Sequence, residues 1–265
     1  MTFFESVGRS TVQRVEYVGA LAIQFWRALA FVVRVNPFGG RRLRWRRVTR
    51  QMAEIGVRSL PVLCLVSGAT GMILALQAGA ELRKFGAMDA VINLVGTSMT
   101  REIGPLIAAI VVIGRSGSAI SAEVATMVVT EEVDALRTMA LDPLDIVLAP
   151  KYVAMLVMMP CLTVAGVLSG ILAGGVFTYY ALGLTLFMYL RRTGEILLMR
   201  DIVSGLVKAV VFGSIIVHVG CLEGFRVTGG PEGVGRSTTD AVVTSIFLVV
   251  IADLICTAFF YFFWT

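Results

Sequence analysis

Five long apolar blocks constrain this 265-residue chain more than any other feature of its sequence. The blocks run over residues 59–80, 87–114, 146–184, 202–222 and 240–264. Each reaches or exceeds the roughly 20 residues that an α-helix needs to cross a bilayer. Hydrophobic residues make up 57% of the chain and charged residues only 15%, which is too apolar for a soluble domain of this length. We therefore predict an all-α polytopic membrane protein with about five transmembrane helices.

The first 58 residues form a separate N-terminal segment ahead of a transmembrane domain at 59–265. Tyr17–Val35 is apolar but contains Arg27 and Arg34, which favours a helix lying in the membrane interface over one crossing it. The basic run at 41–47, RRLRWRR, follows directly. Beside a membrane span such a run indicates contact with anionic headgroups, and it gives little support to nucleic-acid binding.

The distribution of basic residues predicts the orientation of the chain. Eleven of its 23 lysines and arginines precede residue 59, so the positive-inside rule places the N-terminus in the cytoplasm. Five spans then place segments 115–145 and 223–239 inside, and segments 81–89 and 185–201 outside with the C-terminus.

Two adjacent charged residues, Arg101 and Glu102, interrupt the second apolar block. A charge at the centre of a membrane helix costs about 2.5 to 3.5 kcal/mol, so such groups usually face a cavity or a partner group. Neighbours in sequence point in different directions, so we expect that the two do not neutralise each other and that one faces a polar substrate headgroup while the other pairs within the protein. Gly104-Pro105 follows and predicts a kink or break. A structural ion pair that fixes helix packing is the alternative to a substrate contact.

The acidic stretch after the second block predicts a short docking helix at about 130–142. Thr130 is the expected N-cap, and Glu131 and Glu132 would occupy the first turn, where the helix dipole favours carboxylates. Asp142-Pro143 would end it. One face would carry the apolar residues Val129, Val133, Leu136 and Ala140. A solvated loop helix without a partner is the alternative.

Small residues recur at four-residue spacing in two of the blocks. Gly166, Gly170 and Gly174 form one such face, and Gly71, Ala75 and Gly79 form another. Small residues at this spacing allow two membrane helices to approach closely, within one subunit or between two.

No motif for catalysis, metal binding or nucleotide binding stands out. The four cysteines are isolated in apolar segments, and His218 is the only histidine, so a metal site is unsupported. No lysine is followed by Ser or Thr, so the phosphate-binding G-x-x-x-x-G-K-[ST] loop is missing. We expect no cofactor in this chain; energy for active transport would come from elsewhere.

Several motifs together resemble the MlaE (YrbE) family, the permease subunits of ABC transporters that move phospholipids or related lipids. They are Arg101-Glu102-x-Gly104-Pro105, Gly114-Arg115-x-Gly117-Ser118-Ala119 with Ala122-Glu123, Thr130-Glu131-Glu132, Met139-Ala140-x-Asp142-Pro143 and Gly235-Arg236-Ser237-Thr238-Thr239. The resemblance runs from the N-terminal segment to the last span. It implies a transport subunit of the inner membrane, not an enzyme.

The resemblance also implies partners and residue roles. It suggests a homodimer, two cytoplasmic ATPases that bind the ATP, an MCE-domain protein on the outer side, and a small STAS-type regulatory subunit. The lipid cavity would be bordered by Arg101, Glu102, Leu74, Leu82 and Phe85. The ATPase would dock on Glu131, Glu132, Leu136, Arg137, Met139 and Asp142.

Two readings of another class compete with the lipid permease. An ion-coupled secondary transporter would use Arg101 and Glu102 as a relay, but the internal duplication common in such proteins is missing. A membrane anchor that only holds an ATPase is the other alternative.

Overall fold

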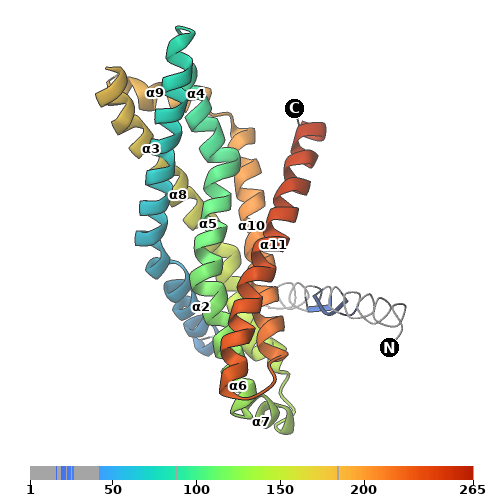
Figure 1. The fold of residues 1–265 in the computed structure, drawn as a ribbon. Helices are drawn as coiled ribbons and strands as arrows, with labels where there is room; N and C mark the ends of the chain where they lie inside the picture. The colour runs from blue at the N-terminus through green and yellow to red at the C-terminus, as the bar shows by residue number, and fades with distance from the viewer. Residues whose placement is uncertain are drawn as a thin grey trace.

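The structure is a computed structural model that describes residues 42–264 except Met88 and Leu184, together with scattered positions between residues 16 and 26. The predicted interfacial helix at Tyr17–Val35 falls almost wholly outside the described residues. All secondary-structure elements of the described residues are helices, and the long ones lie side by side as a bundle (Figure 1).

The first half of the bundle contains two long helical segments. The first comprises α2 (Arg42–Ile55), the 3-10 turn η1 (Val57–Ser59) and α3 (Leu60–Lys84). The second comprises α4 (Asp89–Ser98), the π-helical turn η2 (Met99–Ile103), α5 (Gly104–Val112), the π-helical turn η3 (Ile113–Gly117) and α6 (Ser118–Val129). The short helix α7 (Glu132–Thr138) follows.

The second half contains three long helices and one short one. They are the π-helical turn η4 (Leu144–Leu148) leading into α8 (Ala149–Leu182), then α9 (Leu186–Ile196), α10 (Met199–Phe225) and α11 (Pro231–Trp264).

Five segments of the described chain are long and apolar enough to cross a membrane, which confirms the predicted all-α polytopic fold. They are Trp45–Lys84, Ala90–Val129, Ile146–Ala181, Met199–Phe225 and Pro231–Phe263. The second segment is longer than its apolar block indicates. Ile120 and Val124 of α6 are buried, so residues 115–129 continue this helix instead of belonging to the loop after it.

Helices α3 and α8 pack closely along their small-residue faces, within one subunit. A Cβ atom on Gly71 would lie 2.1 Å from the carbonyl oxygen of Gly170, and one on Gly174 would lie 3.2 Å from that of Gly71. The absence of side chains therefore lets the two backbones meet, as the spacing of the glycines predicted.

The loop predicted at 185–201 contains a helix, α9, that the sequence analysis missed. Tyr189 of α9 is fully buried and packs in a cluster with Val95 and Met99 of the second segment. Burial raises the pKa of the Tyr189 phenol to about 12, so the hydroxyl stays protonated over the physiological range. Helix α9 thus closes one end of the bundle.

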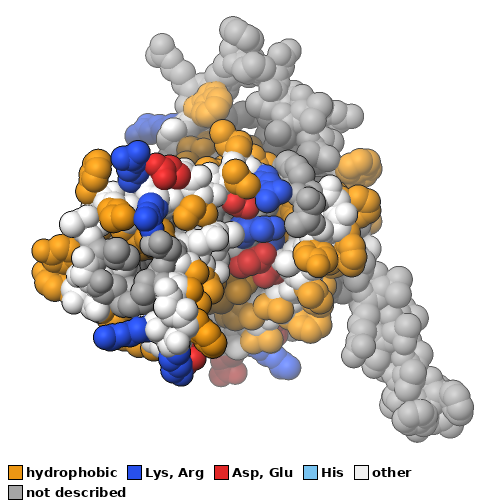
Figure 2. Space-filling model, turned by 90° about the horizontal axis from the view of Figure 1, so that it is seen from above, with side chains coloured by type: hydrophobic (Ala, Val, Ile, Leu, Met, Phe, Trp, Pro, Cys, Tyr) orange, Lys and Arg blue, Asp and Glu red, His pale blue; other side chains and the backbone are white. Residues whose placement is uncertain are grey.

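The connections separate into two ends. Helix α7 and the connection between α10 and α11 lie at one end, whereas α9, the turn between α3 and α4, and the C-terminus lie at the other (Figure 1). Seen from the α9 end, apolar side chains gather around the rim, with acidic and basic side chains next to each other between them (Figure 2). Successive loops thus lie at alternate ends of the bundle, which agrees with the predicted alternation of loops between the two sides of the membrane.

Candidate functional site

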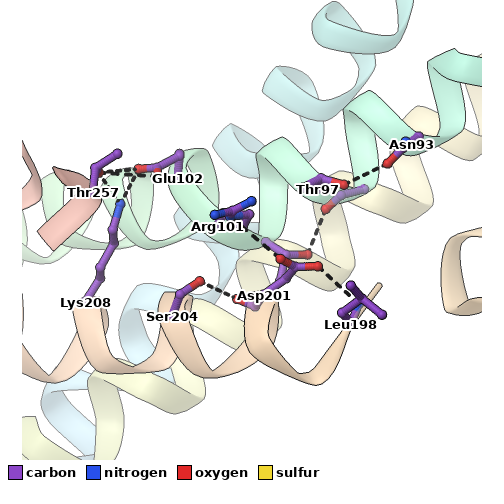
Figure 3. A network of polar contacts seen from close by, with 11 residues as sticks. Asn93, Thr97, Arg101, Glu102, Leu198, Asp201, Ser204, Lys208 and Thr257 are labelled. Carbon is purple, nitrogen blue, oxygen red and sulfur yellow. Dashed lines mark hydrogen bonds and ion pairs between the residues drawn. The ribbon is translucent and has the colours of Figure 1, made fainter. Parts of the chain in front are cut away.

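The adjacent charges of η2 have different ion-pair partners, both of which lie on α10 (Figure 3). Arg101 lies against Asp201 at the start of α10, with Nε 3.7 Å from Oδ1. Glu102 forms an ion pair with Lys208, two turns further along α10. The two residues therefore do not neutralise each other, as we expected from their adjacency.

Lys208 is the centre of a cluster that joins three helical segments. Its side chain is 1% exposed, and its Nζ donates to a carboxylate oxygen of Glu102 and to the Thr257 hydroxyl at 2.7 Å. Nζ also lies 2.9 Å from Oδ1 of Asp253 on α11. A buried ammonium group needs such partners, because its desolvation is costly without them.

The carboxylates of this cluster are more accessible than the lysine. The Glu102 side chain is 39% exposed and that of Asp253 is 19% exposed. The Thr257 hydroxyl lies 2.8 Å from the Asp253 carbonyl oxygen and 3.2 Å from Oε2 of Glu102. One buried cation thus holds two carboxylates, and Glu102 presents a partly exposed negative group at membrane depth.

Asp201 is fixed by its own helix before it meets Arg101. Its Oδ2 accepts a hydrogen bond from the backbone N–H of Leu198 at 3.1 Å, in the first turn of α10, where the helix dipole favours a carboxylate. Asp201 is buried, whereas Arg101 is 34% exposed. At 3.7 Å the pair is electrostatic without a hydrogen bond, so this contact uses none of the guanidinium N–H donors.

The π-helical turn η2 explains how this site is built around Gly104-Pro105. Proline has no N–H and its ring crowds the carbonyl four residues earlier, which is Arg101. The helix widens here, and Gly104 N–H donates to Met99 O, five residues back. The helix continues through the turn, so the predicted kink or break takes the form of a π-helical turn.

A glycine on α10 brings that helix against the widened turn. A Cβ on Gly205 would lie 2.3 Å from the carbonyl oxygen of Thr100. This close approach places Asp201 and Lys208, on either side of Gly205 in sequence, opposite Arg101 and Glu102.

The three apolar candidates on α3 do not share one environment. Leu74 and Leu82 are half-buried and pack against the cluster around Val95 and Tyr189. Phe85 is 80% exposed at the C-terminal end of α3. The structure thus places Leu74 and Leu82 on the inner side of α3 and leaves Phe85 outside the packed interior.

Helix α7 is shorter than the predicted stretch and starts differently. The Thr130 hydroxyl donates back to Thr126 O at 2.9 Å, so Thr130 ends α6 instead of capping α7, and the predicted N-cap is wrong. Glu131 precedes the helix in a left-handed conformation with φ 60°. Asp142 lies beyond α7 and accepts a hydrogen bond from Leu144 N–H at 3.0 Å.

The candidate docking residues of this segment differ in exposure. Val133 is buried and Leu136 half-buried, whereas Glu131, Glu132 and Ala140 are exposed. Met139 is a large apolar side chain with 68% exposure. Arg137 pairs with Asp134 at 3.1 Å on the surface. Met139 is therefore the most exposed large apolar side chain of this segment, ahead of Leu141 at 41%, and the predicted apolar face is partly buried in the fold.

The sequence analysis assigned no role to Lys208, Asp201, Asp253 or Thr257. The signal for Lys208 and Asp253 was present, since both are charged residues within apolar blocks. Asp201 and Thr257 gave no comparable signal, because a boundary carboxylate and a membrane threonine are common.

Five candidate spans, with charged side chains inside the bundle, indicate a multi-pass membrane protein. The family model described as "Permease MlaE" matches residues 48–259. The chain therefore belongs to the MlaE permease family, a family of ABC transporter permeases.

Three relatives support this assignment, and the two from Rickettsia are similar in length to this chain. A probable ABC transporter permease protein of Rickettsia felis is 38% identical over 97% of this chain and 96% of its own length. A probable ABC transporter permease protein of Rickettsia typhi is 37% identical over 95% of both chains. The protein TRIGALACTOSYLDIACYLGLYCEROL 1, chloroplastic, of Arabidopsis thaliana is 34% identical over 83% of this chain and 63% of its own.

Proposed function

We propose that this chain is the membrane subunit of an ABC transporter that moves phospholipid or a related lipid between the inner membrane and an MCE-domain protein. The observation that carries the proposal is the partly exposed Glu102 carboxylate, which buried Lys208 holds at membrane depth. Such a group offers a polar contact to a headgroup, while the apolar helices around it suit acyl chains. The name of the Arabidopsis relative contains that of a lipid, which supports the substrate class.

The partners of this proposed transporter follow from its class. A permease without a nucleotide-binding motif needs a separate ATPase, for which α7 is the proposed docking site. A second copy of the chain, an outer MCE-domain protein and a small STAS-type subunit complete the proposed assembly. Family membership weighs against an ion-coupled transporter built on the Glu102 cluster, because ABC transporters draw on ATP.

Glu102→Ala is expected to reduce lipid transfer at least tenfold while the purified complex keeps its subunits. The carboxylate would no longer contact the headgroup, whereas Lys208 would keep Asp253 and Thr257 as partners. The measurement is ATP-dependent transfer of a labelled phospholipid between proteoliposomes and the MCE-domain protein. Glu81→Ala, on the surface of α3, serves as the control. Wild-type transfer by Glu102→Ala would exclude a role of Glu102 in lipid contact, and unaltered transfer without ATP would point to ion coupling instead.

Met139→Asp is expected to weaken ATPase binding by about 2 kcal/mol, because exposed apolar anchors often carry most of an interface's free energy. Glu132→Ala should cost about 1 kcal/mol as a peripheral charge. Met139 is preferable to Leu136 for this test, since Leu136 is half-buried and its replacement also disturbs the fold. Co-purification of the ATPase with the tagged permease measures the effect. Full recovery of the ATPase with Met139→Asp would place the docking surface elsewhere.

We further propose that the end of the bundle bearing α7 faces the cytoplasm and that the C-terminus lies outside. The eleven basic residues before residue 59 support this orientation. A reporter fused after Thr265 is expected to be active only on the outer side. Activity of that reporter in the cytoplasm would reverse the assignment.

A further inference from the structure

A second group of charged side chains surrounds two adjoining cavities between α2, α6 and the start of α8. The cavities have volumes of about 330 and about 130 Å³ and share Gln51, Glu54 and Glu123 in their linings. None of these residues belongs to the Glu102 cluster. The cavities are therefore a distinct feature of the molecule.

The lining of the cavities has an excess of positive charge. Five cationic side chains face two carboxylates, so three positive charges remain uncompensated. The cations are Arg47, Arg50, Arg58, Arg115 and Lys151.

Both carboxylates are already engaged by two of these cations. Glu54 Oε1 lies 3.2 Å from Nε of Arg50. Glu123 Oε2 lies 2.5 Å from Nζ of Lys151, whose side chain is only 2% exposed. The remaining three arginines therefore supply the excess charge.

Arg115 is held in place without being neutralised. Its Nη1 donates to the Ser59 hydroxyl at 2.9 Å and lies 3.4 Å from the carbonyl oxygen of Glu54. Both acceptors are uncharged. Within the part of the chain that the structure describes, no ion pair involves Arg47, Arg58 or Arg115. Guanidinium groups arranged in this way suit a phosphate, which accepts several charge-assisted hydrogen bonds.

The same cavities have an apolar side and lie where the chain passes from polar to apolar. Met127, Ile146, Val147 and Pro150 line the larger cavity opposite the arginines. Polar α2 leads through the turn η1 into apolar α3, so this part of the fold belongs at the membrane boundary. We propose that the cavities bind the phosphate-bearing headgroup of an anionic membrane lipid, with its acyl chains continuing along the apolar side. This site is independent of the proposed transport route through Glu102.

Native mass spectrometry of the full-length chain in neutral detergent tests this site. The added probes are dioleoylphosphatidylglycerol, dioleoylphosphatidylcholine and inorganic phosphate, each on its own. We expect the wild-type chain to retain phosphatidylglycerol preferentially. Arg47→Gln/Arg58→Gln should weaken that binding about tenfold or more, since two charge-assisted contacts are lost.

Two matched variants separate charge at this site from general effects. Arg47→Lys/Arg58→Lys keeps both charges and should retain most of the binding. Arg83→Gln removes an arginine from the last turn of α3, at the opposite end of the bundle, and should have no effect. Equal phosphatidylglycerol binding by the wild type and the double glutamine variant would overturn the proposal. Binding of inorganic phosphate alone, without retention of the lipid, would overturn the assignment to a lipid headgroup.

Discussion

Lys208→Met is expected to lower the free energy of unfolding by about 3 kcal/mol, because it leaves Glu102 and Asp253 without their shared cation. The lysine is almost fully buried, whereas both carboxylates keep some exposure, so we expect the lower end of the range for broken buried pairs. Unfolding of the purified chain in mixed micelles with increasing dodecyl sulfate measures the change.

Lys84→Met is the matched control for this experiment. Lys84 pairs with Glu81 at 3.0 Å, but both side chains are about two-thirds exposed. Its loss should cost less than about 1 kcal/mol. Combining Lys208→Met with Glu102→Gln should recover part of the lost stability, since one unpaired charge is removed. Equal stability of Lys208→Met and Lys84→Met would show that the cluster does not stabilise the fold.

Gly71→Ala is expected to destabilise the chain by about 2–3 kcal/mol, because the new methyl group has no room between α3 and α8. The atom it meets, the Gly170 carbonyl oxygen at 2.1 Å, belongs to the backbone and cannot move aside as a flexible side chain would. The same unfolding measurement applies.

Gly114→Ala provides the comparison for Gly71→Ala. A Cβ at Gly114 meets nothing within 4 Å, so this variant should be as stable as the wild type or slightly more stable. If Gly71→Ala and Gly114→Ala unfolded alike, the close approach of α3 and α8 would not depend on the missing side chain.

The number and type of membrane helices could be predicted because the apolar blocks are long and the bilayer sets a minimum length for each. The extension of the second span to Val129 could not be predicted, since α6 mixes Ser, Glu and Thr with its buried apolar residues and so does not read as part of an apolar block. Helix α9 was missed for a related reason. It lies between two apolar blocks, which predicts a loop, although Leu186, Tyr189 and Thr193 share one face.

The candidate site could be predicted only in part. Arg101 and Glu102 stood out because charge is rare in a membrane helix, but their partners depend on which helices become neighbours. Gly205 decides that α10 approaches η2, and a single glycine among 27 does not reveal its contact from sequence. The start of α7 was misassigned because Thr130 had two available roles. Its hydroxyl donates a hydrogen bond to Thr126 O in α6, and the sequence pattern does not distinguish this role from N-capping of α7.

The π-helical turn at Met99–Ile103 changes the rotation of α5 about the helix axis relative to α4. One residue corresponds to about 100° of rotation in an α-helix, so the wider turn lets α4 keep its buried stripe while α5 turns to face other neighbours. Loss of one residue from this turn would therefore act far beyond its own position. It would swing the whole of α4, with Val91 and Val95, away from Tyr189 or carry Glu102 away from Lys208. The register of α4 relative to α5 depends on these five residues.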